Sequence, residues 1–489
     1  MIKVFEGSLI YRVIIAALSW VGQQWRESRI LSRFLSPGNG ELLSENSVFT
    51  KLWLRFHRRL IIVFDKLKLN KLLNNSVFTM PFLWSFITLA LAPILPTMVV
   101  LGITLVCIGS LLLAFCCDPQ KKLVYSPANK PILLFALIYI VATLTSITFS
   151  GSLLGGALTT LFVLFTIVVQ NSVSTKRQLH ALVYAFVVSG AAVSVYGLYQ
   201  FMFGAFVASG WVDSTMFSEI GVRVFSTLGN PNVLSEYLLL VIPFAGASIL
   251  IAKRGIVKLF FTGCLGIMLV CMLLTFARGG WLGLVIAAAL FLVILDRRFI
   301  IVGIVGLLLL YFLLPDVILT RFMSIGNTSD SSTNFRVSIW LGTIAMLRDH
   351  WFAGIGPGVA AFNKVYPLYS FNTVYAPHSH NLYLQVICDA GVIGIVVFLA
   401  VLFNYFRNLC SAVARASENT SKILQTAAIS SVLGFLIQGV TDHSFYNYRV
   451  TLVFWAVLGL GALASRSSQL ETDESRGIGT LFSGVSKGG

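Results

Sequence analysis

The feature that most constrains this chain is a long series of apolar runs separated by short polar breaks. Each run approaches the roughly 20 apolar residues that a helix needs to cross a bilayer. A backbone inside lipid has to satisfy its own hydrogen bonds, and an α-helix does so within one segment. The runs therefore predict an all-α, polytopic membrane protein with about twelve transmembrane helices. The predicted spans lie near residues 80–95, 97–115, 131–149, 152–170, 180–204, 234–252, 256–276, 280–295, 299–314, 382–404, 423–441 and 449–464.

The composition agrees with a membrane protein and argues against a soluble one. Hydrophobic residues make up 57% of the chain and charged residues 11%, whereas soluble globular proteins carry about 25% charged residues. The net charge of +16 could indicate a nucleic-acid partner, but the basic residues lie mainly between the apolar runs. That placement orients a protein in a membrane. We therefore expect a lipid bilayer, and no nucleic acid, around this chain.

The distribution of basic residues predicts which breaks face the cytoplasm, because cytoplasmic loops carry an excess of Lys and Arg. If the basic N-terminal region is cytoplasmic, every second break should be basic, and this holds along the whole chain. Both termini are then cytoplasmic, and the breaks at 205–233 and at 315–381, between spans nine and ten, face outside. The predicted cytoplasmic breaks hold Lys121, Lys122, Lys130, Lys176, Arg177, Lys253, Arg254, Lys258, Arg297, Arg298, Arg407, Arg415, Lys422 and Arg466.

Three regions follow from these patterns. Residues 1–76 form a basic, amphipathic, cytoplasmic region, in which Lys51–Lys71 reads as an interfacial helix on anionic lipid. Residues 77–464 form the transmembrane domain with the long external loop 315–381. Residues 465–489 form a cytoplasmic tail that we expect to be disordered.

Several arginines lie outside, where the orientation rule does not explain them. Arg223 sits in the 205–233 break, Arg278 in a tight ARGG turn, and Arg336 in a predicted surface helix over Asn334–Asp349. A guanidinium group stays charged and grips phosphate oxygens in pairs. Arg278 is flanked by small residues, which would let an anionic headgroup approach it. Alternatively, Arg278 only reaches lipid phosphate at the interface, and Arg223 pairs with an acidic residue of its own loop, Glu219 or Asp213.

The stretch Tyr375–Gly394 brings a histidine to the mouth of an apolar run. An imidazole, with an unperturbed pKa of about 6.5, suits the removal of a proton from a hydroxyl group. Alternatively, His380 only anchors its helix. A metal site at His378 and His380 would lack a nearby acidic or cysteine cluster. Asp442 and His443 could form an acid–imidazole pair, but neighbouring residues on a helix do not face each other. Asp389 lies on the opposite side of its helix from His380, which favours a role in helix packing.

Four stretches together resemble the O-antigen ligase and polymerase superfamily of membrane proteins. They are RVFSTLGNPN (223–232), TFARGGWLG (275–283), the NFR…W…GIGPG segment (334–358) and HNLYLQVICDAGVIG (380–394). The resemblance implies a metal-independent glycosyltransferase without a cofactor, located in the cytoplasmic (inner) membrane and active at its outer face. Such a protein moves a glycan from undecaprenyl diphosphate to a hydroxyl of a glycan, lipid or protein acceptor.

The same resemblance implies roles for individual residues. His380 matches the catalytic histidine of the family, and Arg223 and Arg278 match the arginines that hold the lipid diphosphate. We expect Arg336 and Asn381 to be further substrate contacts. Asp389 stands where the family pattern usually has Glu.

The runs SVYGLYQF (194–201), RVFSTLGNPN and NFRVSIW are also similar to a cyanobacterial group of membrane proteins described as inorganic-carbon transporters. This second resemblance implies a carrier for bicarbonate or another small anion. Carriers place their sites near the middle of the membrane, whereas the charges here collect at one face. That position and the His380–Asn381 pair favour the enzyme.

Overall fold

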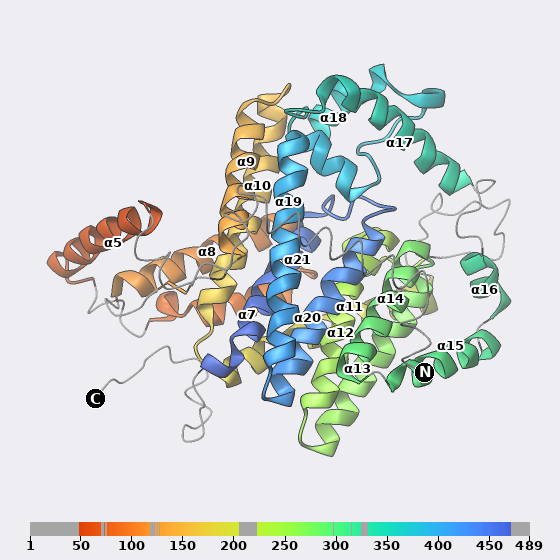
Figure 1. Cartoon of the computed structure of the whole chain (residues 1–489), viewed down its shortest axis with the longest axis horizontal. Coiled ribbons are helices and arrows are strands. Elements are labelled where there is room, and N and C mark those ends of the chain that lie inside the picture. The colour runs from red at the N-terminus through yellow and green to blue at the C-terminus, as the bar shows by residue number, and fades with distance from the viewer. Residues whose placement is uncertain are drawn as a thin grey trace, which may run out of the picture.

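A computed structural model provides the structure of this chain (Figure 1). It describes residues 48–69, 73, 76–117, 123–124, 126, 128–204, 223–296, 298–313, 315–323 and 331–470. The predicted features of residues 1–47, most of the 205–233 loop and the tail from residue 471 lie outside the described part.

The described part of the chain is helical and contains no strand, which confirms the predicted all-α class. Its α-helices are α5 (Val48–Lys66), α7 (Pro81–Leu91), α8 (Thr97–Cys117), α9 (Asn129–Leu144), α10 (Phe149–Ser172), α11 (Lys176–Phe203), α12 (Pro231–Ile251), α13 (Gly255–Leu274), α14 (Arg278–Leu295), α15 (Phe299–Leu313), α16 (Asp316–Met323), α17 (Ser331–His350), α18 (Val359–Val365), α19 (Leu382–Arg415), α20 (Asn419–Gln438) and α21 (Tyr448–Ser465). Short 3₁₀ turns are η1 (Val77–Thr79), η2 (Ser226–Leu228), η3 (Tyr366–Leu368), η4 (Phe371–Thr373) and η5 (Ser467–Gln469).

Each predicted span coincides with one of these helices. Among the described residues, nine helices are long and apolar enough to cross a membrane. The predicted spans near 80–95, 131–149 and 299–314 form the shorter helices α7, α9 and α15. The chain is therefore a multi-pass membrane protein, and the total of twelve crossings stays a prediction.

The centre of the bundle consists of α12, α20 and α21, which are the most buried of the long helices. Small residues let α14 approach α20 closely, as is common between membrane helices. A Cβ atom on Gly283 of α14 would lie 2.6 Å from the carbonyl oxygen of Gly434 in α20. This contact fixes where α14 begins relative to the end of α20.

The described residues of the segment 315–381, which we predict to be external, are mostly helical. The predicted helix over Asn334–Asp349 is confirmed as α17, and α17 and α18 lie across the upper end of the bundle (Figure 1). Side chains of α17 and α18, such as Ile339 and Phe362, share a small apolar core with Cys388 of α19. Between the two helices, glycines with positive φ angles at positions 354, 356 and 358 turn the chain.

The predicted span 382–404 is not one regular helix, which corrects that expectation. Gly391 has φ 65° and ψ −167°, so α19 breaks there. The turn between α17 and α18 satisfies the backbone groups that the break exposes: the Ile355 amide donates to the Cys388 carbonyl at 2.6 Å, and the Val392 amide donates to the Trp351 carbonyl at 2.8 Å. The break thus joins the external segment to the first turns of α19.

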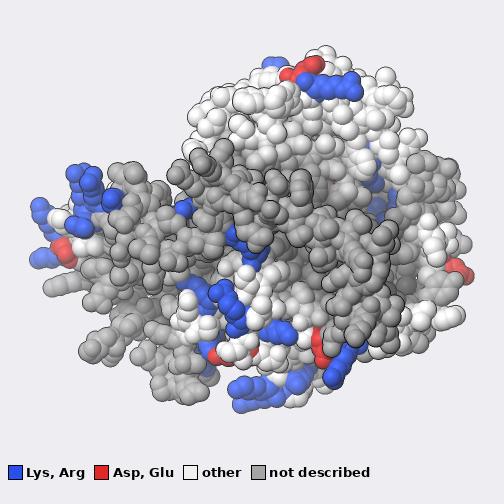
Figure 2. Space-filling model, viewed as in Figure 1, with Lys and Arg blue, Asp and Glu red and all other residues white. Residues whose placement is uncertain are grey.

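Basic side chains gather at the end of the bundle opposite α17 and α18. Figure 2 shows Lys and Arg along the lower edge and on α5 at the left. Breaks that we predict to be cytoplasmic meet there: Lys176 pairs with Glu418 at 2.6 Å, and the Lys422 ammonium donates to the Leu295 carbonyl at 3.2 Å. This arrangement agrees with the predicted orientation, which itself stays a prediction.

The orientation makes a direct prediction for cysteine labelling. A membrane-impermeant thiol reagent added from outside should label a cysteine placed at Ser214 or Ser331, since both lie in breaks predicted to be external. The same reagent should not label a cysteine at Ser126 or Ser417 until the membrane is permeabilised. Labelling of Ser126→Cys in intact cells would reverse the orientation and put the site described below on the cytoplasmic side.

Candidate functional site

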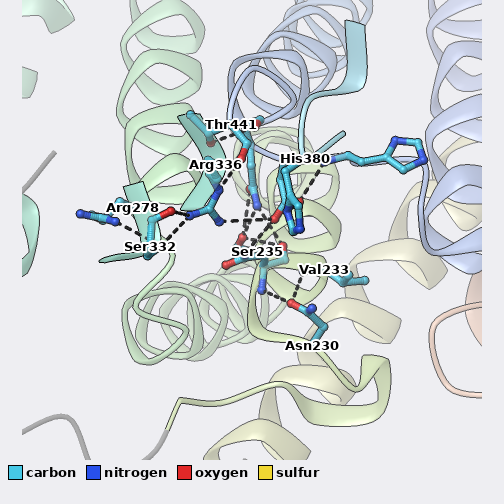
Figure 3. A network of polar contacts seen from close by, with 12 residues as sticks. Asn230, Val233, Ser235, Arg278, Ser332, Arg336, His380 and Thr441 are labelled. Atoms are coloured by element: carbon cyan, nitrogen blue, oxygen red, sulfur yellow. Dashed lines mark hydrogen bonds and ion pairs between the residues drawn. The ribbon is translucent and has the colours of Figure 1, made fainter. Parts of the chain in front are cut away.

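A cavity of about 310 Å³ opens where α12, α14, α16 and α17 meet the loop between α20 and α21. Four of the described residues that line it are arginines: Arg223, Arg278, Arg321 and Arg336. Asp442 is the acidic residue among them. Figure 3 shows Arg278, Arg336 and His380 around one network of polar contacts. The cavity is therefore strongly cationic and suited to a polyanion.

Arg278 reaches the cavity because of the glycines that follow it. Gly279 packs against Thr441, where an added Cβ atom would lie 2.5 Å from the Thr441 hydroxyl oxygen. The small residues of the ARGG turn thus serve helix packing, and they set the arginine at the start of α14 beside the α20–α21 loop. The Arg278 guanidinium lies near the hydroxyl groups of Ser332, at 3.5 Å, and Thr333, at 3.3 Å.

Arg223 enters the cavity from the loop before α12. Its Nε donates to the Thr275 carbonyl at 2.7 Å, and its Nη2 donates to the Asn232 side-chain oxygen at 3.0 Å. Burial and the neighbouring guanidinium groups of Arg321 and Arg336 lower the pKa of Arg223 to about 9. The side chain is still protonated at neutral pH. Its predicted alternative partners, Glu219 and Asp213, lie outside the described residues.

Arg336 joins the cavity to the carboxylate of Asp442. Its Nε donates to the Thr441 carbonyl at 2.8 Å, and its Nη1 donates to the Ser332 hydroxyl at 2.6 Å. Its Nη2 lies 3.9 Å from a carboxylate oxygen of Asp442. Three of the predicted substrate-binding residues, Arg223, Arg278 and Arg336, are therefore brought together.

Arg321, on α16, is a fourth cavity arginine that our sequence analysis did not assign to the site. Its side chain is buried, with 2% of its surface exposed. The sequence does contain a sign of its role, because Arg321 lies in a break predicted to be external, where the orientation rule does not explain an arginine. Arg321 was not singled out, because its position in a short segment between two polar stretches did not distinguish it from other charged residues there.

His380 is paired with Asp442, which the sequence alone did not show. The Nδ1 atom of His380 lies 3.2 Å from a carboxylate oxygen of Asp442. Burial alone would raise the pKa of Asp442, but the hydrogen bond to His380 and the charges of His380 and Arg336 hold that pKa below its usual range. An ionised carboxylate only accepts hydrogen bonds, so Nδ1 carries the proton. The Nε2 atom of His380 is then the one that can accept a proton.

From the sequence we expected Asp442 and His443 to be neighbours on a helix and therefore set Asp442 aside, and that expectation is wrong. Asp442 and His443 lie in the loop between α20 and α21, and no helix geometry governs them. Asp442 faces His380, and the amide of Asn232 donates to its other carboxylate oxygen at 2.6 Å. The carboxylate is thus fixed from two sides.

The backbone at His380 is held in an unusual conformation. Its φ angle is +47°, a region that residues other than Gly seldom adopt. The Trp340 indole donates to the His380 carbonyl at 3.2 Å, and the His380 amide donates to Nδ1 of His378 at 3.1 Å. Such strain persists only where the surroundings enforce it, which is common at functional sites.

Asn381 does not line the cavity, although we predicted a substrate contact for it. Its side-chain oxygen accepts the Leu384 amide at 2.9 Å and caps α19. Its side-chain nitrogen donates to the Val440 carbonyl at 2.8 Å. The structure therefore favours a role in which Asn381 positions the preceding histidine.

A metal ion is a second possible occupant of the histidine cluster. Among the described residues, ligand atoms of His378, His380 and Asp442 lie within 4.8 Å of one another. However, Nδ1 of His378 already accepts a backbone amide, and Asp442 is bound to Asn232 and His380. The guanidinium groups beside them repel a cation. This donor set favours an anion in the adjacent cavity over a metal.

Asp389 does not line the arginine cavity, and its hydrogen bonds link α19 to α9. It accepts hydrogen bonds from the Tyr139 hydroxyl at 3.3 Å and from the Gln385 amide at 2.9 Å.

A comparison with protein families gives one match. A family model described as O-antigen ligase matches residues 263–399. The matched region includes Arg278, Arg321, Arg336 and His380, whereas Asp442 lies beyond its end. A search of curated proteins gave no match.

Proposed function

We propose that this chain, whose residues 263–399 match a family model described as O-antigen ligase, moves a glycan from undecaprenyl diphosphate to an acceptor hydroxyl. The observation that carries this proposal is the convergence of four arginines on one cavity beside the Asp442–His380 pair. The arginines suit a diphosphate, and the histidine suits a hydroxyl proton. The proposed place of reaction is the outer face of the cytoplasmic membrane.

In the proposed reaction, the acceptor oxygen forms a bond to the anomeric carbon of the glycan. Its proton passes to Nε2 of His380. The bond from the anomeric carbon to the diphosphate breaks, and its electron pair stays on the phosphate oxygen. The anomeric configuration inverts, because the acceptor attacks from the side opposite the leaving group.

The arginines would contribute most as the leaving group departs. The diphosphate gains negative charge when its bond to the sugar breaks. Fixed cationic groups that already point at this charge stabilise the transition state more than the bound donor. Asp442 would stabilise the imidazolium that forms on His380, and it keeps the proton-accepting nitrogen free.

Uptake of bicarbonate or another small anion is a second candidate, since an arginine-lined cavity can bind any anion. The cavity lies beside the external helices α16 and α17, however, and not in the middle of the bundle. The Asp442–His380 pair also supplies a base, which a carrier for a small anion does not need. Both observations favour the transferase.

The direct test is transfer by the purified protein in a bilayer, with an undecaprenyl-diphosphate-linked glycan as donor and a hydroxyl acceptor. We expect a glycosylated acceptor and free undecaprenyl diphosphate, in equal amounts. Bicarbonate flux into vesicles without turnover of any donor would instead support the carrier.

We expect Arg278→Lys to weaken donor binding, because an ammonium group cannot reproduce the paired contacts of a guanidinium. Loss of such a charge-assisted hydrogen bond costs about 1.5–3 kcal/mol, so the affinity should fall at least about tenfold. Binding of a fluorescent lipid-linked diphosphate to the purified protein measures this change.

Arg348→Lys is the matched control for this variant. Arg348 is exposed near the end of α17 and does not line the cavity, so its replacement should leave donor affinity unchanged. Wild-type affinity in Arg278→Lys would mean that Arg278 only anchors the protein to lipid phosphate.

A further inference from the structure

A second cavity lies on the other side of the histidines from the arginines. It measures about 40 Å³ and lies between the turn before α18, the start of α19 and the α20–α21 loop. His378 lines this cavity, and its ring centroid lies 4.1 Å from that of His380. Since His380 binds Asp442 at the edge of the arginine cavity, the two histidines separate the two cavities.

An exposed aromatic ring stands at the mouth of the second cavity. Tyr446, in the α20–α21 loop, is 44% exposed, and its ring centroid lies 4.6 Å from that of His378. An exposed tyrosine offers a broad apolar face together with a polar tip. One face of a sugar ring carries mostly C–H groups and fits such a surface.

The interior of the second cavity offers polar groups that a hydroxyl can bind. Gln385, Asp389 and His443 line it. Burial lowers the pKa of His443 to about 3, so its imidazole is neutral. Its Nδ1 atom is buried and has no hydrogen-bond partner among the described residues. A buried polar atom of this kind is normally satisfied by water or by a ligand.

The size of the cavity limits what can enter. A volume of about 40 Å³ holds a water molecule or a hydroxymethyl group, but it does not hold a sugar ring. A sugar would therefore lie over Tyr446 and reach into the cavity with one substituent.

The position of this cavity fits the direction of attack. Inversion requires the acceptor oxygen to approach the anomeric carbon from the side opposite the diphosphate. With the diphosphate among the arginines, the acceptor has to come from the side of His378 and Tyr446. His380 lies between the two and can reach the acceptor proton.

We propose that Tyr446 and the second cavity form the acceptor subsite and that the acceptor is a saccharide. The sugar ring lies on Tyr446, and one of its hydroxyl groups binds in the cavity beside His443. A neighbouring hydroxyl gives its proton to His380 as it attacks the donor. This inference rests on the proposed function, because it needs a transfer reaction at His380.

The test is a kinetic comparison in the transfer assay with a soluble saccharide acceptor. Tyr446→Ala should raise the KM for the acceptor about tenfold, as expected for the loss of an aromatic contact. The KM for the donor and kcat at saturating acceptor should stay near their wild-type values. Tyr446→Trp keeps an aromatic face and should restore the acceptor KM.

Tyr375→Ala is the matched control, because Tyr375 is also exposed in the external part and lines neither cavity. It should leave the acceptor KM unchanged. Equal acceptor KM values in wild type and Tyr446→Ala would overturn the subsite, as would a rise in both KM values that Tyr446→Trp does not reverse. Failure of the proposed function is distinguishable, because the wild-type protein would then transfer no glycan at all.

Discussion

His380→Ala should lower the rate of glycan transfer by about 10²–10⁴, the usual contribution of a general base. The variant lacks the imidazole that we propose takes the acceptor proton. Donor binding should stay nearly intact, because His380 does not line the arginine cavity. Single-turnover transfer and donor affinity, measured on the same purified protein, separate these two effects.

His380→Gln sharpens this prediction, since glutamine keeps a hydrogen bond but cannot act as a base. It should be nearly as slow as His380→Ala. His350→Ala is the matched control, because His350 lies at the end of α17 against Tyr369 and away from both cavities. Transfer at the wild-type rate in His380→Ala would remove the histidine from the mechanism.

Asp442→Asn should lower kcat by about 10–10³. In the proposed mechanism the carboxylate orients the base and stabilises the imidazolium, so its loss should remove only part of the rate that the general base contributes. The variant keeps the shape of the side chain and loses its charge. Measuring kcat of the purified protein at neutral pH and saturating substrates tests this effect.

Donor binding gives Asp442→Asn a second readout. Asp442 is the acidic residue among the described residues that line the arginine cavity, so its loss should leave diphosphate binding equal or tighter. Asp316→Asn, at an exposed position at the start of α16, controls for a change of charge on the external side. A fall in donor affinity without any change in kcat would show that Asp442 only supports the fold.

Much of the fold could be predicted from the sequence, because lipid imposes one simple pattern. Each apolar run had to become a helix, and each did so. The break at Gly391 was not predicted, since a single glycine inside an apolar run gives no sign that another segment will supply its backbone hydrogen bonds. The same limit applies to Gly279 and Gly280, whose small size serves contact with neighbouring helices.

The candidate site was predicted in part. The orientation rule does not explain arginines in breaks predicted to be external, so Arg223, Arg278 and Arg336 could be singled out. Asp442 could not, because its partner His380 lies 62 residues away and the two meet only through helix packing. A carboxylate between two helices has many possible partners in a sequence, and only the fold selects one.

Helix α17 carries two contacts four residues apart, which places them on one face of the helix. Arg336 lines the cavity proposed for the leaving group, and Trp340 holds the carbonyl of His380. Both contacts therefore belong to a single rigid body. A variant that shifts α17 would therefore be expected to disturb the phosphate contact and the support of the His380 backbone together.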